Sequence, residues 1–240
     1  MLSYKPWSPD SLLRLLLFLF AALSGAGLLG AAADRYWAAV PEETRRFWVS
    51  FGGGTLMQVL GLVLIARFLG ENRLGWREGF GLRLEESPRM LLSGVVAAVL
   101  GLALAMGILL GSQWLMALAN VTPVEQSSIT ALRQSEDVAR RLAVALTTVL
   151  LAPLFEELLF RGILYPALKQ AGYPRFALWG TAVLFGLSHV NLLTFASLTC
   201  FGLLLAVLYE RTDNLLAPIT AHAVFNAVNY AWVVLGQSAA

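Results

Sequence analysis

Long apolar segments most constrain what this chain can fold into. Seven are present, near residues 12–33, 47–66, 90–118, 142–160, 176–189, 192–209 and 215–235. A helix needs about 20 such residues to cross the hydrocarbon core of a bilayer, and only the fifth and sixth segments are clearly short. The sequence therefore predicts an all-α, polytopic transmembrane bundle of about seven helices. The first segment exceeds the roughly 7 to 15 apolar residues of a secretory signal, so we expect an uncleaved helix there.

The composition supports a membrane protein and excludes several other classes. Hydrophobic residues make up 58% of the 240 positions, and charged residues only 13%. The net charge of +2, with basic residues scattered singly, gives no sign of a nucleic-acid partner. The one cysteine, Cys200, rules out a disulfide framework and is expected to pack as a small apolar residue.

The charged linkers predict the topology. The segment 67–89 carries five arginines and is expected to be cytoplasmic by the positive-inside rule. Seven spans then place eleven Lys and Arg inside and six outside, with the N-terminus inside and the C-terminus outside. We expect this segment, with Trp76 and Phe80, to rest on anionic headgroups. The predicted location is the cell membrane.

The segment 151-LAPLFEELLFRG-162 places three charges in an apolar run. An ionisable side chain at mid-span costs about 2.5 to 3.5 kcal/mol on insertion scales, so each charge needs a partner or a function. Glu157 and Arg161 are four residues apart on one helical face and can neutralise each other. Glu156 points about 100° away and has no such local partner. The alternative is a helix end whose charges reach the headgroups.

Both histidines of the chain lie in apolar sequence. His189 ends 185-FGLSH-189, and His222 is followed four residues later by Asn226, which places an imidazole and a carboxamide on one helical face. As a structural pair, His222 and Asn226 would hydrogen-bond a neighbouring helix.

Helix geometry brings Glu156 and His189 to one level. A turn near Gly172 lies about sixteen residues from each, or about 24 Å along two antiparallel helices. The return from His189 through 190–198 would need a shallow or broken helix that lines a cavity. We expect this cavity within the membrane, opening to the cytoplasm, and the segment between Asn120 and Arg141 to shield its mouth.

The patterns EExxxR, FxxxH and HxxxN, in this order, resemble the three motifs of the CAAX prenyl protease and bacteriocin-processing family (CPBP, or Abi) of intramembrane endopeptidases. The resemblance covers residues 142–230. It implies peptide-bond hydrolysis by a glutamate-activated water, with Glu156 as general base, His189 holding the water, and His222 and Asn226 stabilising the oxyanion. Glu157, Arg161 and Phe185 would support these groups. Residues 1–118 would form N-terminal helices and 119–240 the catalytic core of one continuous membrane domain.

Three alternatives stay open. Zinc could be held by His189, His222 and a glutamate, although no HExxH motif is present, and a zinc-bound Glu157 would have to leave Arg161. We therefore expect no cofactor. A non-catalytic adaptor or immunity protein would keep the motifs for stability. A transporter would also carry intramembrane charges, but no inverted repeat is evident. The expected partners of the enzyme are the lipid bilayer and a peptide or protein substrate, with lipidated and membrane-associated substrates among the candidates.

Overall fold

The computed structural model describes residues 2–124, 129, 132 and 137–237, and within them all regular secondary structure is helical. This confirms the all-α prediction. Six described helices are long and apolar enough to cross a membrane: Pro9–Tyr36, Thr44–Glu71, Ser87–Leu118, Val138–Gln170, Leu192–Thr212 and Leu216–Gly236. The remaining predicted span is α9 (Pro174–Ser188), which has only 15 residues.

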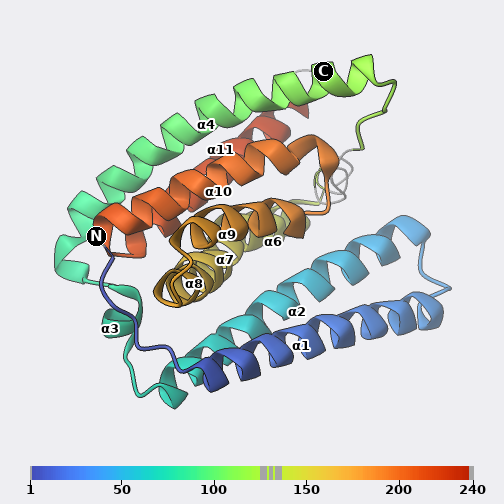
Figure 1. Ribbon diagram of the computed structural model, residues 1–240. Coiled ribbons are helices and arrows are strands. Elements are labelled where there is room, and N and C mark those ends of the chain that lie inside the picture. The colour runs from blue at the N-terminus through green and yellow to red at the C-terminus, as the bar shows by residue number, and fades with distance from the viewer. Residues whose placement is uncertain (1, 125–128, 130–131, 133–136, 238–240) are drawn as a thin grey trace.

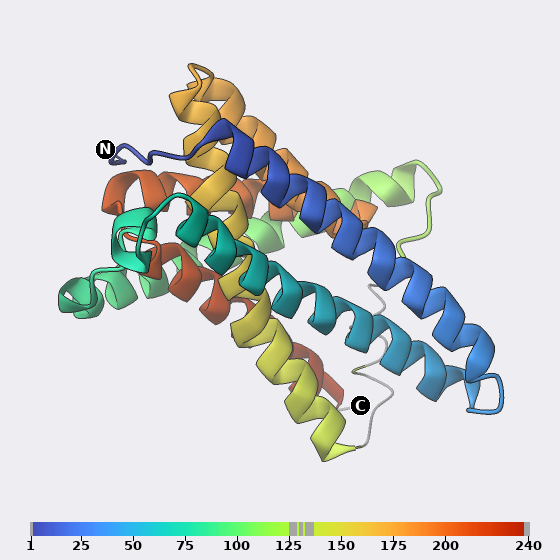
Figure 2. The ribbon, with the colours of Figure 1, turned by 90° about the horizontal axis from the view of Figure 1, so that it is seen from below.

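The helices form two groups around a central rod (Figure 1). The helices α1 (Pro9–Tyr36) and α2 (Glu42–Glu71) make a long antiparallel hairpin. On the other side, α4 (Ser87–Leu118) packs along both α10 (Leu192–Thr212) and α11 (Leu216–Gln237). Seen from below, α2 crosses over the central rod (Figure 2).

The central rod is the fourth span, and it contains two π-helical segments. Its pieces are α6 (Val138–Leu146), η2 (Thr147–Leu151), α7 (Ala152–Glu157), η3 (Leu158–Leu164) and α8 (Tyr165–Gln170), of which η2 and η3 are π-helical. Each π-helical segment ends two residues before a proline, Pro153 or Pro166. A proline has no N–H and its ring crowds the carbonyl four residues earlier, so a widened turn accommodates it. Glu156 and Glu157 lie between these two distortions.

Two tight turns connect the central rod to α9 and α9 to α10. Gly172, with φ of 94°, precedes Pro174 at the start of α9, as the sequence predicts. At the other end, Val190 has φ of 48°, and the side chain of Asn191 caps α10 by accepting from the Thr194 N–H. The helix α10 then runs unbroken for 21 residues. The expected shallow or broken helix after His189 is therefore wrong, because a left-handed residue and an Asn cap reverse the chain within three residues.

The connections gather at two opposite ends of the bundle (Figure 1). The N-terminus, the connection between α2 and α4, the α8–α9 turn and the α10–α11 turn share one end, and the α1–α2 and α9–α10 turns lie toward the other. We call the first the N-terminal end. The predicted topology requires this grouping, because it places the N-terminus and these three connections on the same side of the membrane. Part of the segment expected to shield the cavity mouth, residues 125–128, 130–131 and 133–136, lies outside the described residues. Within its described part, Val124 accepts a hydrogen bond from Asn191 through its backbone carbonyl.

The Arg-rich connection differs from its predicted role at one residue. It contains α3 (Trp76–Phe80) and the short η1 (Leu84–Glu86). Phe80 does not rest on headgroups but is fully buried, and its carbonyl accepts a hydrogen bond from the Leu215 N–H. Gly162 makes room for its ring, since a Cβ there would lie 2.7 Å from it. The connection is thus anchored to the bundle at Phe80, whereas Trp76, 45% exposed, keeps an outward position.

Candidate active site

Glu157 and Arg161 form the ion pair that their spacing predicts. Arg161 donates to Oε1 of Glu157 at 2.6 Å, and both side chains are fully buried. The guanidinium also donates to the Gly202 carbonyl at 3.1 Å and lies over the Phe185 ring, 4.5 Å from its centroid. The central rod, α9 and α10 thus meet at Arg161. These contacts compensate a charge that is removed from water.

His222 extends this pair across the bundle. Its Nδ1 lies 2.8 Å from Oε1 of Glu157, so Nδ1–H donates to the same oxygen that Arg161 uses. The tautomer is thereby fixed, and Nε2 is left for other contacts. Nε2 lies 3.8 Å from Oε2 of Glu156. A single imidazole therefore lies between the two glutamates, with one ring nitrogen toward each of them.

Glu156 differs from Glu157 in its surroundings. Its side chain is 19% exposed, whereas Glu157 is completely buried. Oε2 of Glu156 is itself buried and has no hydrogen-bond partner among the described residues. Oε2 of Glu157 also lacks a hydrogen-bond partner there, but its other oxygen accepts from both Arg161 and His222. Glu156 is thus the more accessible of the two carboxylates, whereas Glu157 is held by two neighbours.

Aromatic rings enclose the His222 imidazole. Phe185 of α9 and Phe201 of α10 each make an edge contact with it, with ring centroids 5.6 Å apart in both cases. Phe160 packs edge-on against Phe185 at 5.5 Å. The imidazole is buried among these rings, and exclusion of water strengthens its hydrogen bond to Glu157.

His189 joins the cluster through Phe185. The two ring centroids are 5.0 Å apart, and His189 Nδ1 lies 2.8 Å from the Phe185 carbonyl oxygen. A carbonyl only accepts, so Nδ1 carries the proton and Nε2 is again the nitrogen left for other contacts. In both histidines Nδ1 is hydrogen-bonded and Nε2 is the nitrogen left for other contacts. The His189 side chain is only partly buried.

Asn226 lies one turn beyond His222 on α11 and contacts η2. Its Nδ2 donates to the Thr148 carbonyl at 2.9 Å. A carboxamide has two N–H donors, and this bond uses one of them. The widened turn of η2 supplies the carbonyl, because backbone hydrogen bonding is altered there.

Several contributors to the site were not expected from the sequence. Phe201 and Gly202 belong to α10, which carries none of the three motifs, and Thr148 contributes only its backbone. Two features of the sequence could have indicated them: the glycine at position 202 within an apolar helix, and the proline that follows η2. A Cβ at Gly202 would lie 3.2 Å from both Arg161 Nη2 and Ala182 Cα, so a small residue is needed there.

Comparison with known proteins identifies a family that this chain resembles. Residues 138–228 match the model of a family described as "Type II CAAX prenyl endopeptidase Rce1-like". This confirms the family resemblance that the motifs predict, and the matched segment contains all of their residues. YdiL of Bacillus subtilis (strain 168), named as a candidate membrane peptidase, is 35% identical over 77 residues, which are 32% of this chain and 32% of YdiL.

A second relative covers a similar share. YpbD of the same organism, an uncharacterized protein, is 35% identical over 83 residues, which are 33% of this chain and 40% of YpbD. The chain thus spans well under half the length of both curated relatives. No solved structure matches it significantly.

Proposed function

We propose that this chain, whose residues 138–228 match the type II CAAX prenyl endopeptidase Rce1-like family, is a membrane endopeptidase in which Glu156 activates the attacking water. The observation that carries the proposal is the division of labour between the two glutamates. Glu157 is held by Arg161 and His222, whereas Glu156 is partly exposed and keeps an unpaired oxygen near His222 Nε2.

The reaction needs a base that later returns its proton. In the proposed mechanism, Glu156 takes a proton from water while the water oxygen bonds to the carbonyl carbon of the scissile peptide. The carbonyl π electrons move to oxygen and give a tetrahedral oxyanion. Glu156 then gives the proton to the leaving nitrogen, and the C–N bond breaks.

The other polar groups have roles that follow from their free donors and acceptors. His189 Nε2 is suited to hold the water, since Nδ1 already donates to Phe185. The second N–H of Asn226 would stabilise the oxyanion, and His222 would do so in the form in which Nε2 also carries a proton, because Nδ1–H already donates to Glu157. Donors fixed in advance each contribute a few kcal/mol. Glu157 orients His222 and does not touch the substrate.

Metal-free chemistry is the form of this proposal that the side chains favour. Among the described residues, no three His, Cys, Asp or Glu side chains are grouped as a metal-ion site. A zinc-bound Glu157 would also leave the buried Arg161 without its partner. We expect that the purified protein still cleaves its substrate after a chelator has removed any zinc. A strict requirement for stoichiometric zinc would refute the metal-free form.

We place the substrate entrance at the N-terminal end of the bundle and assign that end to the cytoplasm. The Arg-rich connection at this end supports the assignment by the positive-inside rule. His222 lies six residues after Leu216, the start of α11 at the same end, which is about 9 Å into the helix. The proposed substrate is a peptide or protein, lipidated or otherwise membrane-associated.

The deciding experiment compares Glu156→Gln with the wild type in native membranes, by quantitative analysis of peptide termini. A cleavage product that disappears at unchanged protein abundance supports catalysis. Glu42→Gln, at the far end of α2 and paired with Arg46, is the matched control and should leave the product in place. A Glu156→Gln protein that still makes the cleavage product would refute the proposed protease. If no cleavage product differed between the two kinds of membrane, a non-catalytic adaptor would be favoured.

A further inference from the structure

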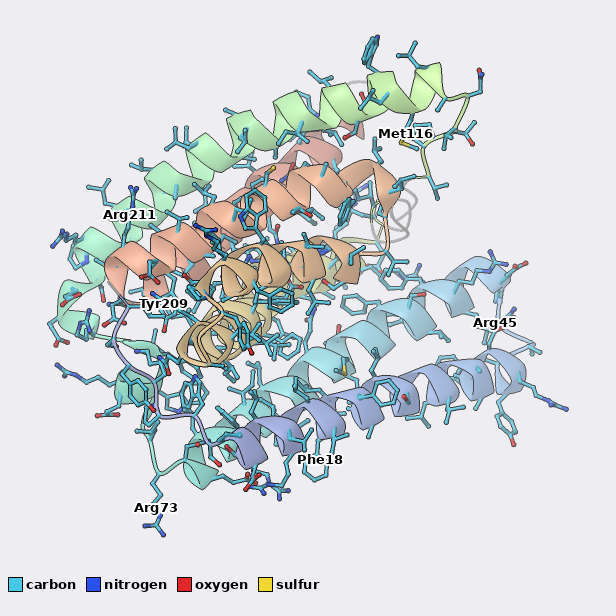
Figure 3. The ribbon with its side chains drawn as sticks, in the orientation of Figure 1. Phe18, Arg45, Arg73, Met116, Tyr209 and Arg211 are labelled. Carbon is cyan, nitrogen blue, oxygen red and sulfur yellow. The ribbon has the colours of Figure 1, made fainter. Side chains whose placement is uncertain are left out.

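The α1–α2 hairpin has a shallow surface depression that is separate from the candidate active site. We call it the hairpin pocket. Its charged lining residues are Arg14 of α1 and Arg67 and Glu71 of α2, with Ser11 and Phe18 beside them. Figure 3 shows Phe18 on α1, between Arg73 at the N-terminal end of the hairpin and Arg45 at the other end.

The charges of the hairpin pocket do not cancel. Glu71 accepts from Arg14 at 3.1 Å through Oε2 and from Arg67 at 2.9 Å through Oε1, so one carboxylate serves two guanidinium groups. The net charge of the three side chains is +1. Arg14 is 51% and Arg67 58% exposed, and within the described part of the chain neither Nη atom of Arg67 donates a hydrogen bond. Spare donors on adjacent guanidinium groups suit an oxyanion with several acceptor atoms.

The pocket is held in shape by the hydrogen bonds beneath it. Asn72, after the last turn of α2, accepts from the Ser8 N–H at 2.8 Å and donates to Ser11 Oγ at 2.9 Å. It also donates to the Phe68 carbonyl. These bonds tie the start of α1 to the end of α2. Arg67 in turn stands over the Phe18 ring, 5.1 Å from its centroid, which limits its movement.

Helix lengths place the pocket at the membrane interface. With 28 and 30 residues, α1 and α2 are about 42 and 45 Å long. A hydrocarbon core of about 30 Å leaves roughly 6 to 8 Å of each helix outside it at each end. Arg14 lies five residues after the start of α1 and Arg67 four before the end of α2, or about 6 to 8 Å from those ends. Both are therefore at the depth where the hydrocarbon meets the lipid phosphates.

The surface beside the pocket is apolar. Leu17 and Phe18, three and four residues after Arg14, flank it on the helix surface and are both exposed. An interfacial pair of guanidinium groups with an apolar helix face directly below it matches the two parts of a phospholipid, the phosphodiester and the acyl chains.

We propose that the hairpin pocket binds one phospholipid, with the phosphodiester held by Arg14 and Arg67 and the acyl chains lying along Leu17 and Phe18. The single negative charge of the phosphodiester balances the net charge of the pocket. The bound lipid fixes the depth and tilt of the hairpin, which lies outside the segment that the family match covers.

The test is native mass spectrometry of the purified full chain with phosphatidylglycerol, diacylglycerol or free glycerol 3-phosphate. One tightly bound phosphatidylglycerol is expected, with diacylglycerol and glycerol 3-phosphate each at least about tenfold weaker, because each lacks one of the two recognised parts. Arg14→Gln and Arg67→Gln should each weaken phosphatidylglycerol binding by about tenfold, the effect of one charge-assisted hydrogen bond.

The matched control is Arg46→Gln, which removes the same charge from an exposed pair with Glu42 at the opposite end of α2. It should bind the lipid as the wild type does. Arg14→Lys with Arg67→Lys keeps the charges but not the guanidinium donors, so it should bind more weakly than the wild type and more tightly than the two Gln changes combined. The melting temperatures of the Gln variants should stay close to that of the wild type, which separates lost binding from misfolding. Unchanged binding by the Gln variants, equal binding of diacylglycerol, or full competition by glycerol 3-phosphate would each overturn the proposal.

Discussion

Glu157 and His222 are joined by a hydrogen bond of 2.8 Å between Oε1 and Nδ1, although they are 65 positions apart in the sequence. This bond links the first and third motifs directly. It assigns the buried glutamate to the imidazole and leaves the neighbouring Glu156 facing the other ring nitrogen at 3.8 Å. Two adjacent glutamates therefore have different physical tasks, and substitutions should separate them.

Glu156→Gln and Glu157→Gln are expected to fail in different ways. Glu156→Gln should abolish cleavage while the free energy of unfolding changes by about 1 kcal/mol or less, because its buried oxygen has no partner to lose. Glu157→Gln leaves the buried Arg161 without a counter-charge and should cost about 3 to 5 kcal/mol. Thermal unfolding in detergent, beside the assay of peptide termini, measures both. Equal unfolding temperatures for the two variants would contradict this distinction.

Two glycines of α9 offer a test of how closely this helix must pack against α10. A Cβ at Gly186 would lie 2.4 Å from Thr199 Oγ1 and 2.9 Å from the Phe195 carbonyl oxygen, so Gly186→Ala should separate α9 from α10 and destabilise by about 1 to 3 kcal/mol. Gly180→Ala, on the same helix, would meet only the Phe176 ring at 3.4 Å. The measurement is the melting temperature of each variant. A melting temperature for Gly186→Ala at or above that of Gly180→Ala would show that the close approach of the helices is not needed.

The sequence predicts those parts of the structure that depend on local spacing. The apolar segments locate the spans, the four-residue spacing gives the Glu157–Arg161 pair, and Gly172 with Pro174 marks the turn. It does not predict which glutamate His222 contacts. That choice depends on the rotation of the central rod, and the π-helical segments on both sides of α7 change this rotation by inserting an extra residue into a turn.

Long-range packing also limited the prediction at Phe80. An aromatic residue in an Arg-rich connection is typical of an interfacial anchor, and only the small residue at Gly162, 82 positions later, provides the space that buries its ring. Neither position indicates the other in a single sequence. The same holds for Gly202, whose carbonyl accepts from Arg161 across 41 positions.

Phe80→Ala should therefore destabilise the bundle, although the residue lies in a connection. Loss of a fully buried phenyl ring is expected to cost about 3 to 5 kcal/mol. Trp76→Ala, in the same short helix and 45% exposed, should cost clearly less. Thermal unfolding of the two variants checks this order. If Trp76→Ala were the more damaging, the connection would be held mainly from its outer side.

Lys5 predicts a pH dependence of stability. The side chain is 2% exposed, and burial lowers the pKa of its ammonium group below 10.5, although the nearby Asp213 opposes the shift. Between the folded pKa and 10.5 the unfolded chain holds more protons, so this residue makes the free energy of unfolding rise with pH. Wild type should gain melting temperature relative to Lys5→Met between about pH 7 and pH 10. A difference that stays constant or falls would contradict the assignment.

Asn226 and Asn229 distinguish a catalytic amide from a structural one. Both donate to a backbone carbonyl at 2.9 Å, Asn226 to Thr148 on another element and Asn229 to Phe225 on its own helix. Each Asn→Leu change should cost about 1 kcal/mol of stability, the net effect of one hydrogen bond. Only Asn226→Leu should also lower kcat, by about 100- to 1,000-fold, if its second N–H stabilises the oxyanion. The assay is cleavage of the peptide that the Glu156→Gln comparison identifies. Equal kcat values for the two variants would mean that Asn226 only fastens α11 to η2.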